Sequence, residues 1–345
     1  MSIDPQTVFY YLSVNLTQAL TAISQRDSFL YWPFLVSAAV LALIVAGSAA
    51  RGQSGPDQLS FWDHTRQYFS AAVWWHRSAR ADYRLYFANA LILPVMFGVL
   101  LFSELHVVNW INAALGKAAV SGERGLEAAS IGTRVMFTLI FFVAYDLGRF
   151  VAHCLLHDIS LFWEFHKVHH SAETLTPMTT FRAHPVDLLV MAWVPALITG
   201  LATWAFNQFA AIPVSFYSFL GLHILIFAFS FVGTLRHTHV WLSYGPAWSK
   251  WLISPAQHQL HHSCEAQHLG CNRGFELAIW DRLYGTLYVP ARKETFRMGL
   301  GDGTDGQWHT VQRMYLWPFL NIGRRALNLV RKRPLEPPPS QHSSF

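Results

Sequence analysis

The sequence is short of charged residues. Asp, Glu, Lys and Arg make up 13% of its 345 residues, whereas water-soluble domains carry about 25%. Apolar residues account for 52% of the chain and aromatic residues for 15%. This balance excludes an ordinary soluble domain and predicts an integral membrane protein, in which Trp and Tyr side chains are available for the two membrane interfaces.

Cysteine is also scarce. The chain has only Cys154, Cys264 and Cys271, and no two of them form a Cys-x-x-Cys pair. Such an odd and sparse set argues against a disulfide scaffold and suits a reducing compartment. Residues 1–26 contain Asp4 and lack a basic start followed by a small-residue cleavage site, so no signal peptide is predicted.

Several cofactor motifs are missing. The sequence contains no His-Pro-Gly-Gly segment for haem, no Gly-x-Gly-x-x-Gly for a dinucleotide and no cysteine cluster for an iron–sulfur centre. It also lacks the His-Glu-x-x-His of zinc peptidases. Any redox chemistry in this chain would therefore need electrons from a separate protein, such as a ferredoxin, a cytochrome or a reductase.

Long apolar runs are present instead. Runs near spanning length occur at residues 34–50, 85–102, 135–152, 188–206 and 214–232. The last two are predicted to form a helical hairpin, and the less apolar residues 8–23 are expected to lie in the membrane interface. The predicted fold is an all-α integral membrane protein with four to six transmembrane or interfacial helices.

Lys and Arg are distributed unevenly between the loops. Residues 51–84, 149–187 and 233–345 hold five, three and thirteen of them, whereas residues 109–133 hold two and the turn after residue 206 holds none. Because cytoplasmic loops carry the excess of positive charge, the histidine-rich regions are predicted to form a helical cap on the cytoplasmic face. The expected location is a bacterial cytoplasmic membrane, or the endoplasmic reticulum membrane in a eukaryote. The basic C-terminal segment suits anionic lipid headgroups, and no nucleic-acid partner is expected.

Histidine is the abundant functional residue. Of 18 histidines, 13 lie between His153 and His268. His153 and His157 are four residues apart, which places them on one face of a helix. Two triplets repeat the spacing i, i+3, i+4, again along one helical face: His166, His169 and His170, and then His258, His261 and His262.

This number of histidines predicts a metal centre. Neutral imidazole is the commonest protein metal ligand and suits zinc, copper, iron and nickel. The eight histidines in these blocks exceed the four ligands of one tetrahedral zinc, so their number favours two metal ions without selecting the metal. His223, which lies inside an apolar run, is expected to make a structural hydrogen bond instead.

Residues around the histidine blocks add to the pattern. They comprise Asp146, seven residues before His153; Phe-His-Lys-Val-His-His-Ser at residues 165–171; Arg-Ala-His-Pro at residues 182–185; Ser254 with Pro255; and Asn272 followed by Trp-Asp-Arg-Leu-Tyr-Gly-Thr at residues 280–286. Together these residues resemble the fatty acid hydroxylase and sterol desaturase superfamily, over residues 135–290. The resemblance implies a di-iron site capped onto membrane helices, with O2 as co-substrate, a lipid as substrate and two electrons from an external donor.

The resemblance also assigns roles to individual residues. Nine histidines are the expected ligands of two iron ions: His153, His157, His166, His169, His170, His237, His258, His261 and His262. Five further residues are candidates for ligation or for contact with a ligand: His184, His239, His268, Asp146 and Asp158. Asn272 and Arg273 are candidates for substrate contact. Arg273 stands where relatives usually have an aromatic residue, and a salt bridge at a helix end is its alternative role.

Three segments are predicted from these features. Residues 1–134 are expected to form N-terminal membrane helices and a linker, residues 135–290 the catalytic domain, and residues 291–345 a basic segment with a disordered tail at 334–345. The predicted function is a membrane-bound di-iron oxygenase that hydroxylates, or desaturates, an acyl, sterol, sphingoid or ether lipid. The alternatives are a membrane zinc hydrolase, which needs a Glu base, and a non-enzymatic metal transporter or store, which needs ionisable residues inside its spans.

Overall fold

Three long helices dominate the fold. The computed structural model describes residues 5–52, 58–97, 101–118, 129–210 and 214–330. Its helices α2 (Trp32–Arg51), α7 (Ile131–Asp158) and α9 (Pro185–Phe209) are long and apolar enough to cross a membrane. Their lengths of 20, 28 and 25 residues correspond to about 30–42 Å at 1.5 Å per residue. They coincide with three of the five predicted spans, and the prediction of an all-helical membrane protein is confirmed.

The predicted span at residues 85–102 differs in the structure. Helix α5 (Arg77–Phe97) begins eight residues earlier, and its first two turns carry Arg77, Arg80, Asp82 and Arg84. This charge excludes α5 from the helices that could span by length and composition. Buried residues of α5 face the histidine-rich part of the fold; Asp82, for example, pairs with Arg182.

The predicted span at residues 214–232 is wrong. The described part of this run forms a hairpin of β1 (Ser218–Phe219) and β2 (Leu222–His223), followed by α10 (Ile224–Gly233) of only 10 residues. Leu220 and Gly221, at φ values of 52° and 88°, form the two-residue turn. A run of apolar residues does not distinguish such a turn from a continuous helix, because both have the same composition.

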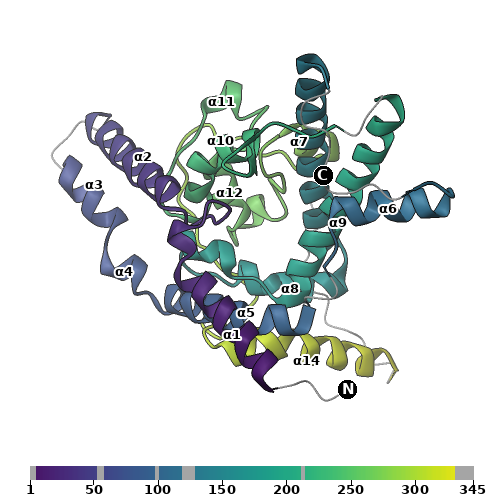
Figure 1. The fold of residues 1–345 in the computed structure, drawn as a ribbon. Helices are drawn as coiled ribbons and strands as arrows, with labels where there is room; N and C mark the ends of the chain where they lie inside the picture. The colour runs from purple at the N-terminus through teal and green to yellow at the C-terminus, as the bar shows by residue number, and fades with distance from the viewer. Residues whose placement is uncertain (1–4, 53–57, 98–100, 119–128, 211–213, 331–345) are drawn as a thin grey trace.

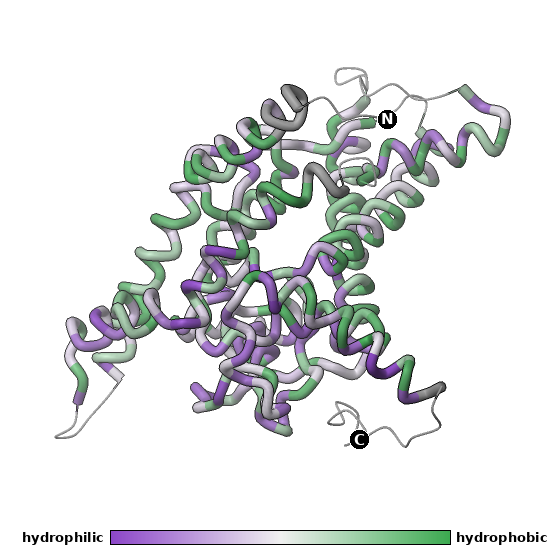
Figure 2. Tube along the Cα trace, turned by 90° about the horizontal axis from the view of Figure 1, so that it is seen from below, coloured by the Kyte–Doolittle hydropathy of each residue, from purple (hydrophilic) through white to green (hydrophobic). Residues whose placement is uncertain are grey.

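The remaining helices are short or lie on the cap. On the N-terminal side they are α1 (Pro5–Leu20), η1 (Ala22–Ser24), α3 (Phe61–Tyr68), α4 (Ala71–Trp74) and α6 (Glu104–Ala114). Further along the chain they are α8 (Ser160–His170), η2 (Pro177–Phe181), η3 (Thr234–His237), α11 (Gly245–Trp248), α12 (Pro255–His261), η4 (Ala266–His268), α13 (Ile279–Tyr284) and α14 (Val311–Val330). In Figure 1, α2 lies on one side of α10 and α12, and α7 with α9 lies on the other. Figure 2 shows hydrophilic residues concentrated in the middle of the molecule, with largely hydrophobic helices extending from it.

Helices α7 and α9 pack tightly against each other. A Cβ added to Gly148 of α7 would lie 2.6 Å from the Cα atom of Pro195 in α9. Only glycine therefore allows the two backbones to approach this closely. The contact fixes the position of the C-terminal half of α7, which carries His153 and His157.

The C-terminal segment folds back under α8. Buried Trp308 and Met314 pack with Ala81 and Leu85 of α5 and with Val168 of α8. Helix α14 contacts both α8 and α5, and Figure 1 shows these three helices together at the base of the molecule. Segments from both ends of the chain thus hold the helix that carries the first histidine triplet. The predicted disordered tail at residues 334–345 lies outside the described residues.

Candidate metal centre

The nine histidines predicted as ligands lie together in two groups. His153, His157, His166, His170 and His261 form the first group, and His169, His237, His258 and His262 form the second. Within each group, one ligand atom from every histidine lies within 4.8 Å of the others. Eight of the nine side chains are buried, and His169 is only partly exposed. Each group is therefore compact enough to hold one metal ion.

Each triplet is divided between the two groups. In α8, His166 and His170 belong to the first group and His169 to the second. In α12 and its C-cap the division is reversed, because His258 and His262 belong to the second group and His261 to the first. Residues four apart on a helix point in nearly the same direction, whereas the residue between them at i+3 is rotated. Two short helices consequently supply both groups at once.

Backbone carbonyls fix which ring nitrogens carry protons in the first group. His153 donates Nδ1–H to the carbonyl of Arg273, and His261 donates Nδ1–H to the carbonyl of Cys271, both at 2.7 Å. A carbonyl oxygen can only accept, so the Nε2 atoms of both rings carry lone pairs. These two Nε2 atoms are 3.1 Å apart. Two facing lone pairs repel each other at this distance unless a cation lies between the rings, as a metal ion would.

His166 adds a third lone pair to the same point. Its Nδ1 lies 2.7 Å from Oδ2 of Asp187, and its Nε2 lies 3.1 Å from Nε2 of His153. A carboxylate on the far nitrogen is the usual partner of a metal-bound imidazole, because it fixes the tautomer and increases the basicity of the ligand atom. The first group thus fits a metal ion by its chemistry as well as its size.

The second group has the same character. His169 donates Nδ1–H to the carbonyl of Arg182 at 3.0 Å, and its Nε2 lies 3.2 Å from Nε2 of His237. Nε2 of His258 is 3.0 Å from the same His237 atom. Both ring nitrogens of His262 are buried and have no hydrogen-bond partner among the described residues. An unpartnered buried group costs about 1–3 kcal/mol, which a metal ion would offset.

Burial keeps these imidazoles neutral. It lowers the pKa of His169 to about 4 and the pKa of His261 to about 3. Both rings are therefore uncharged at pH 7, which is the state that binds a metal ion.

A family comparison agrees with this geometry. The model of the fatty acid hydroxylase family matches residues 138–286. Residues 138–286 therefore form a domain of the fatty acid hydroxylase and sterol desaturase superfamily. All nine histidines lie within the matched hydroxylase domain.

Curated relatives in this superfamily include lipid-oxidising enzymes. The chain is 29% identical over 197 residues to ornithine lipid hydroxylase OlsE of Rhizobium tropici, a match covering 56% of this chain and 53% of that protein. It is 26% identical over 155 residues to human alkylglycerol monooxygenase, covering 45% and 31% respectively. It is 28% identical over 153 residues to the Delta(7)-sterol 5(6)-desaturase ERG3B of Gibberella zeae, covering 44% and 42%. The chain thus spans from about a third to about half of these relatives, and no solved structure matches it significantly.

The three other histidines that were candidates for ligation or for contact with a ligand lie outside both groups. His184 accepts from Val186 N at 3.1 Å and lies 3.2 Å from the carbonyl of Tyr315, so it caps α9 with both ring nitrogens engaged. Nε2 of His239 lies 3.2 Å from the carbonyl of Gln67. His268 contacts Ser263 and Glu294 at 2.9 and 3.0 Å. The structure therefore places His184, His239 and His268 outside the two groups that could hold a metal ion. His223, by contrast, makes the expected structural contacts, with Thr138 O and Leu225 N.

The two candidate carboxylates in α7 bind other parts of the domain. Asp146 accepts from the backbone N–H groups of Glu276 and Leu277 at 3.0 Å and from Trp280 Nε1 at 2.9 Å. It thereby ties the loop before α13 to α7. Asp158 lies 2.8 Å from Nη1 of Arg273 and accepts from the Tyr284 hydroxyl at 2.7 Å.

The predicted substrate contacts have structural roles instead. Asn272 is completely buried at a φ of 51°, and its side chain bonds the carbonyl of Gln257 and the N–H of Tyr288. The guanidinium of Arg273 is 3% exposed and paired with Asp158 at the end of α7. The helix-end salt bridge, the alternative for Arg273, is what the structure contains.

Three partners of the ligands were not predicted from the sequence. Asp187, in the first turn of α9, bonds His166, the Thr180 hydroxyl lies 3.0 Å from Nδ1 of His237, and the carbonyl of Arg182 accepts from His169. None of these residues is at a helical spacing from the histidine that it contacts. Asp187 follows the Arg-Ala-His-Pro segment directly, but nothing in the sequence connects it with His166.

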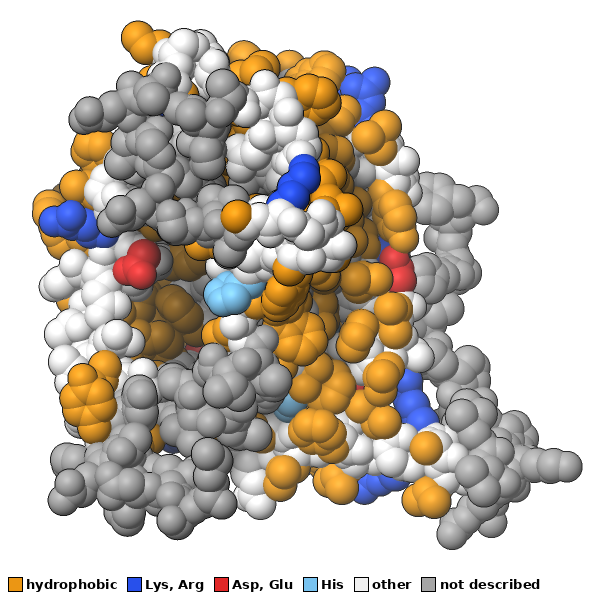
Figure 3. Space-filling model, turned by 45° about the vertical axis from the view of Figure 1, so that its right-hand side comes forward, with side chains coloured by type: hydrophobic (Ala, Val, Ile, Leu, Met, Phe, Trp, Pro, Cys, Tyr) orange, Lys and Arg blue, Asp and Glu red, His pale blue; other side chains and the backbone are white. Residues whose placement is uncertain are grey.

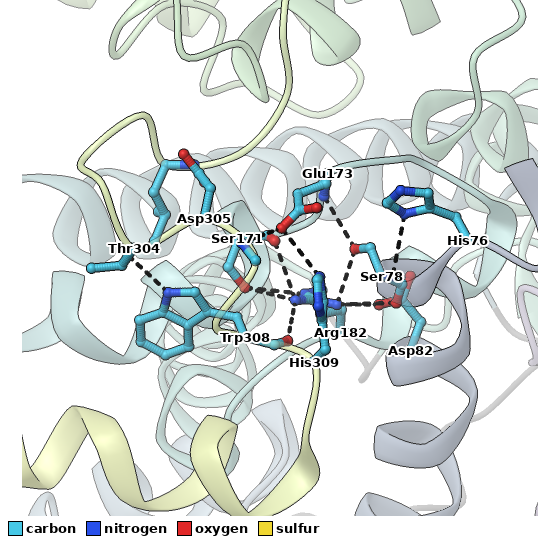
Figure 4. A network of polar contacts seen from close by, with 12 residues as sticks. His76, Ser78, Asp82, Ser171, Glu173, Arg182, Thr304, Asp305, Trp308 and His309 are labelled. Atoms are coloured by element: carbon cyan, nitrogen blue, oxygen red, sulfur yellow. Dashed lines mark hydrogen bonds and ion pairs between the residues drawn. The ribbon is translucent and has the colours of Figure 1, made fainter.

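Arg182 joins the hydroxylase domain to segments outside it. Its fully buried guanidinium bonds Oδ1 of Asp82 in α5 at 2.7 Å, the carbonyl of Trp308 at 2.8 Å and the carbonyl of Val168 at 2.9 Å. Figure 4 shows Arg182 at the centre of this network, between Asp82 on one side and Trp308 on the other. Because the carbonyl of Arg182 holds His169, the second group depends on contacts with residues before and after the matched domain.

Apolar cavities lie beside the hydroxylase domain. One, of about 450 Å³, is lined by α7, α9 and α10 through residues such as Phe141, Tyr145, Met191 and Ile226. Another, of about 300 Å³, lies between α2 and the cap and is lined by Ala38, Tyr68, Met178 and Leu235 among others. Figure 3 shows a face covered mainly by hydrophobic side chains, with a hollow beside which a histidine is visible. Such apolar cavities are of the size that binds small ligands.

Proposed function

We propose that this chain is a membrane-bound oxygenase with two iron ions that hydroxylates a lipid, using O2 and two electrons from another protein. The observation that supports it most is the convergence of nine imidazoles in two adjacent groups whose Nε2 atoms face one another. An alkyl C–H bond offers no charge on which acid–base groups can act. The chemistry therefore needs a bound cofactor.

Iron fits these ligands better than zinc for this purpose. Imidazole binds both metals, but zinc has no redox chemistry. Two iron ions, when bound, would supply the activation of O2. The chain's own contribution is to hold each ring in one tautomer through the carbonyls of Arg182, Arg273 and Cys271 and through Asp187, and to bury the ligands away from water.

A lipid substrate is supported by the position of the centre. His153 and His157 lie at the end of α7, directly after its apolar part, and the 450 Å³ cavity opens among the same membrane helices. The relatives are named for an ornithine lipid, an alkylglycerol and a sterol. We propose hydroxylation in preference to desaturation, of an acyl, sterol, sphingoid or ether lipid. In this proposal residues 135–290 catalyse the reaction, with residues 1–134 and 291–345 as flanking segments.

The proposed setting is the cytoplasmic face of a bacterial inner membrane, or of the endoplasmic reticulum in a eukaryote. The excess of Lys and Arg in the loops that carry the histidines supports this orientation. The electron donor would be a ferredoxin, a cytochrome or a reductase. Among the basic residues near the C-terminus that an acidic donor would contact, Arg325 is already paired with buried Glu164 and Arg324 lies over Trp317. Residues 331–333 lie outside the described residues.

Mass spectrometry of lipids under oxygen-18 gas tests the proposal. Cells that express the chain should accumulate a lipid heavier by one labelled oxygen, and the purified protein should contain two iron ions. His169→Ala and His262→Ala, one change to each triplet, should abolish the product. The matched control is His268→Gln, which changes a buried histidine outside both groups and should leave the product unchanged. If the protein contained one zinc ion per chain and were active without oxygen, the oxygenase proposal would be rejected in favour of the zinc hydrolase.

A further inference from the structure

Arg149 is a charged residue in an unusual place. It lies within α7, a helix long and apolar enough to span a membrane, and its side chain is only 14% exposed. It precedes the ligand His153 by one helical turn, so the two side chains share a face of the helix. Ionisable residues inside a membrane span are costly, and they usually mark a functional site.

Arg149 lies near aromatic rings that belong to the 450 Å³ cavity and to the surroundings of the metal centre. Its guanidinium carbon is 3.7 Å from the ring centroid of Phe275 and 5.7 Å from that of Tyr145. The Phe275 ring lies 5.4 Å from the imidazole of His153. Tyr145 lines the 450 Å³ cavity. The guanidinium of Arg149 therefore lies beside one residue of the cavity wall and is separated from His153 by one aromatic ring.

The hydrogen-bonding capacity of Arg149 is not used. Glu276 is bound through both carboxylate oxygens by Arg236, at 3.0 Å for Nη1 and closer for Nη2. Nη1 of Arg149 forms an ion pair with Oε1 of Glu276 at 3.6 Å, a distance too long for a hydrogen bond. Asp146, the other nearby acid, already accepts two backbone N–H groups and Trp280. Within the described residues, the N–H groups of Arg149 thus donate no hydrogen bond.

We propose that Arg149 binds an oxyanion, a carboxylate or a phosphate, in the headgroup of the lipid substrate. A guanidinium presents a planar fork of donors that matches both groups. With the headgroup at Arg149, the acyl chain extends into the apolar cavity, and the oxidised C–H bond lies within a few bonds of the headgroup. This inference rests on the proposed function and adds the class of lipid to it.

Binding of three matched lipids to the iron-loaded protein under argon tests the inference. The probes are N-oleoylglycine, which carries a carboxylate, 1-oleoyl-lysophosphatidate, which carries a phosphate, and N-oleoylethanolamine, which is a neutral counterpart of the glycine amide. At least one anionic probe should bind the wild type about tenfold or more tightly than the neutral probe, and Arg149→Gln should reduce this ratio to about threefold or less. The anionic probe that binds more tightly shows whether the headgroup of the natural lipid carries a carboxylate or a phosphate.

A second arginine of α7 provides the control. Arg134, at the other end of the helix, also lies over an aromatic ring, 4.1 Å from the centroid of Tyr217. Arg134→Gln should therefore leave the binding ratio unchanged. If Arg149→Gln does not retain iron, Arg149→Lys takes its place, because a lysine keeps the charge but loses the planar fork. Affinity of that variant for the preferred anionic probe should fall by about threefold or more, with iron retained.

Two results would overturn the inference. Equal binding of the neutral and both anionic probes by the wild type would remove its basis. An iron-loaded Arg149 variant that keeps the wild-type preference for an anionic probe over the neutral probe would also overturn the inference. Because binding is measured without turnover, these results are independent of the oxygen-18 experiment. Either result would refute the role of Arg149 and leave the oxygenase proposal intact.

Discussion

His169 donates its Nδ1 proton to the backbone carbonyl of Arg182 at 3.0 Å, while the side chain of the same arginine pairs with Asp82. The first group contains a counterpart, in which His153 donates to the carbonyl of Arg273 and that arginine pairs with Asp158. In both cases an aspartate from another element anchors the arginine that orients a ligand. The two metal sites therefore have separate and comparable supports.

The anchor of the second group is tested by Asp82→Asn. Removing one charge of a buried ion pair costs about 3 kcal/mol or more, and the freed guanidinium would shift the Arg182 carbonyl away from His169. The iron content should fall from two ions toward one per chain, with the second group losing its ion. Iron analysis by mass spectrometry, together with Mössbauer spectra, measures this change.

The control for this change is Asp158→Asn. The side chain of Asp158 is 27% exposed, so the loss of stability should be smaller, and the first group should be the one affected. If both variants keep two iron ions with unchanged spectra, the arginines do not position the ligands.

Thr180→Val tests the contact to His237. The hydroxyl lies 3.0 Å from Nδ1 of His237, and valine has nearly the same shape without the polar group. Metal affinity should fall about 10–100-fold, as is usual when the partner of a metal-bound histidine is removed. Competition with a chelator measures the affinity. Thr174→Val, six residues earlier in the same segment, should have no effect, and an equal loss in both variants would contradict the assignment.

His184→Asn tests the effect of pH on stability. Burial lowers the pKa of His184 to about 4, compared with about 6.5 in the unfolded chain. The unfolded state therefore takes up the proton first as pH falls, so the stability from neutral His184 is complete above pH 6.5 and is lost progressively toward pH 4. Asparagine can also cap a helix but does not titrate.

The measurement compares unfolding of the two proteins at pH 7 and at pH 5. The free energy of unfolding of the wild type should fall by about 2 kcal/mol more than that of His184→Asn over this interval. Both proteins carry iron, so the titration of the ligand histidines cancels in the difference. Parallel pH curves would mean that His184 is not buried as a neutral ring.

Gly148→Ala tests the contact between α7 and α9. The new Cβ would lie 2.6 Å from the Cα atom of Pro195, so one helix must move. Such overpacking costs about 1–3 kcal/mol, which thermal unfolding in detergent would detect. Gly132→Ala in the same helix is the control, because its nearest neighbour is Ser130 Oγ at 3.9 Å. That change should be neutral or slightly stabilising.

The sequence predicted which histidines lie together in the two groups better than it predicted the contacts that hold them. The spacing of His166, His169 and His170 is a local property, because neighbours on one helical turn are close whatever the rest of the chain does. The partners of these rings come from distant segments, as Asp187 does for His166. A single sequence contains no signal for such pairings.

The membrane helices show the same division. Composition and length were sufficient for α2, α7 and α9, which are continuous apolar helices. They failed at residues 214–232, where the turn at Leu220 and Gly221 interrupts the run. The split of each triplet between the two groups of histidines was also missed. It depends on which side of α8 and α12 faces each group, and that is decided by packing.

The contact between Arg182 and Trp308 has a consequence for synthesis of the chain. The two residues are separated by 126 positions, which a ribosome covers in about 6 to 25 seconds at 5–20 residues per second. During that interval the guanidinium of Arg182 lacks the carbonyl of Trp308. The last turn of α8 also lacks the Trp308 side chain that packs near Val168. Iron delivered to the nascent polypeptide would meet an unfinished second site, so stable loading has to follow translation of the region around Trp308.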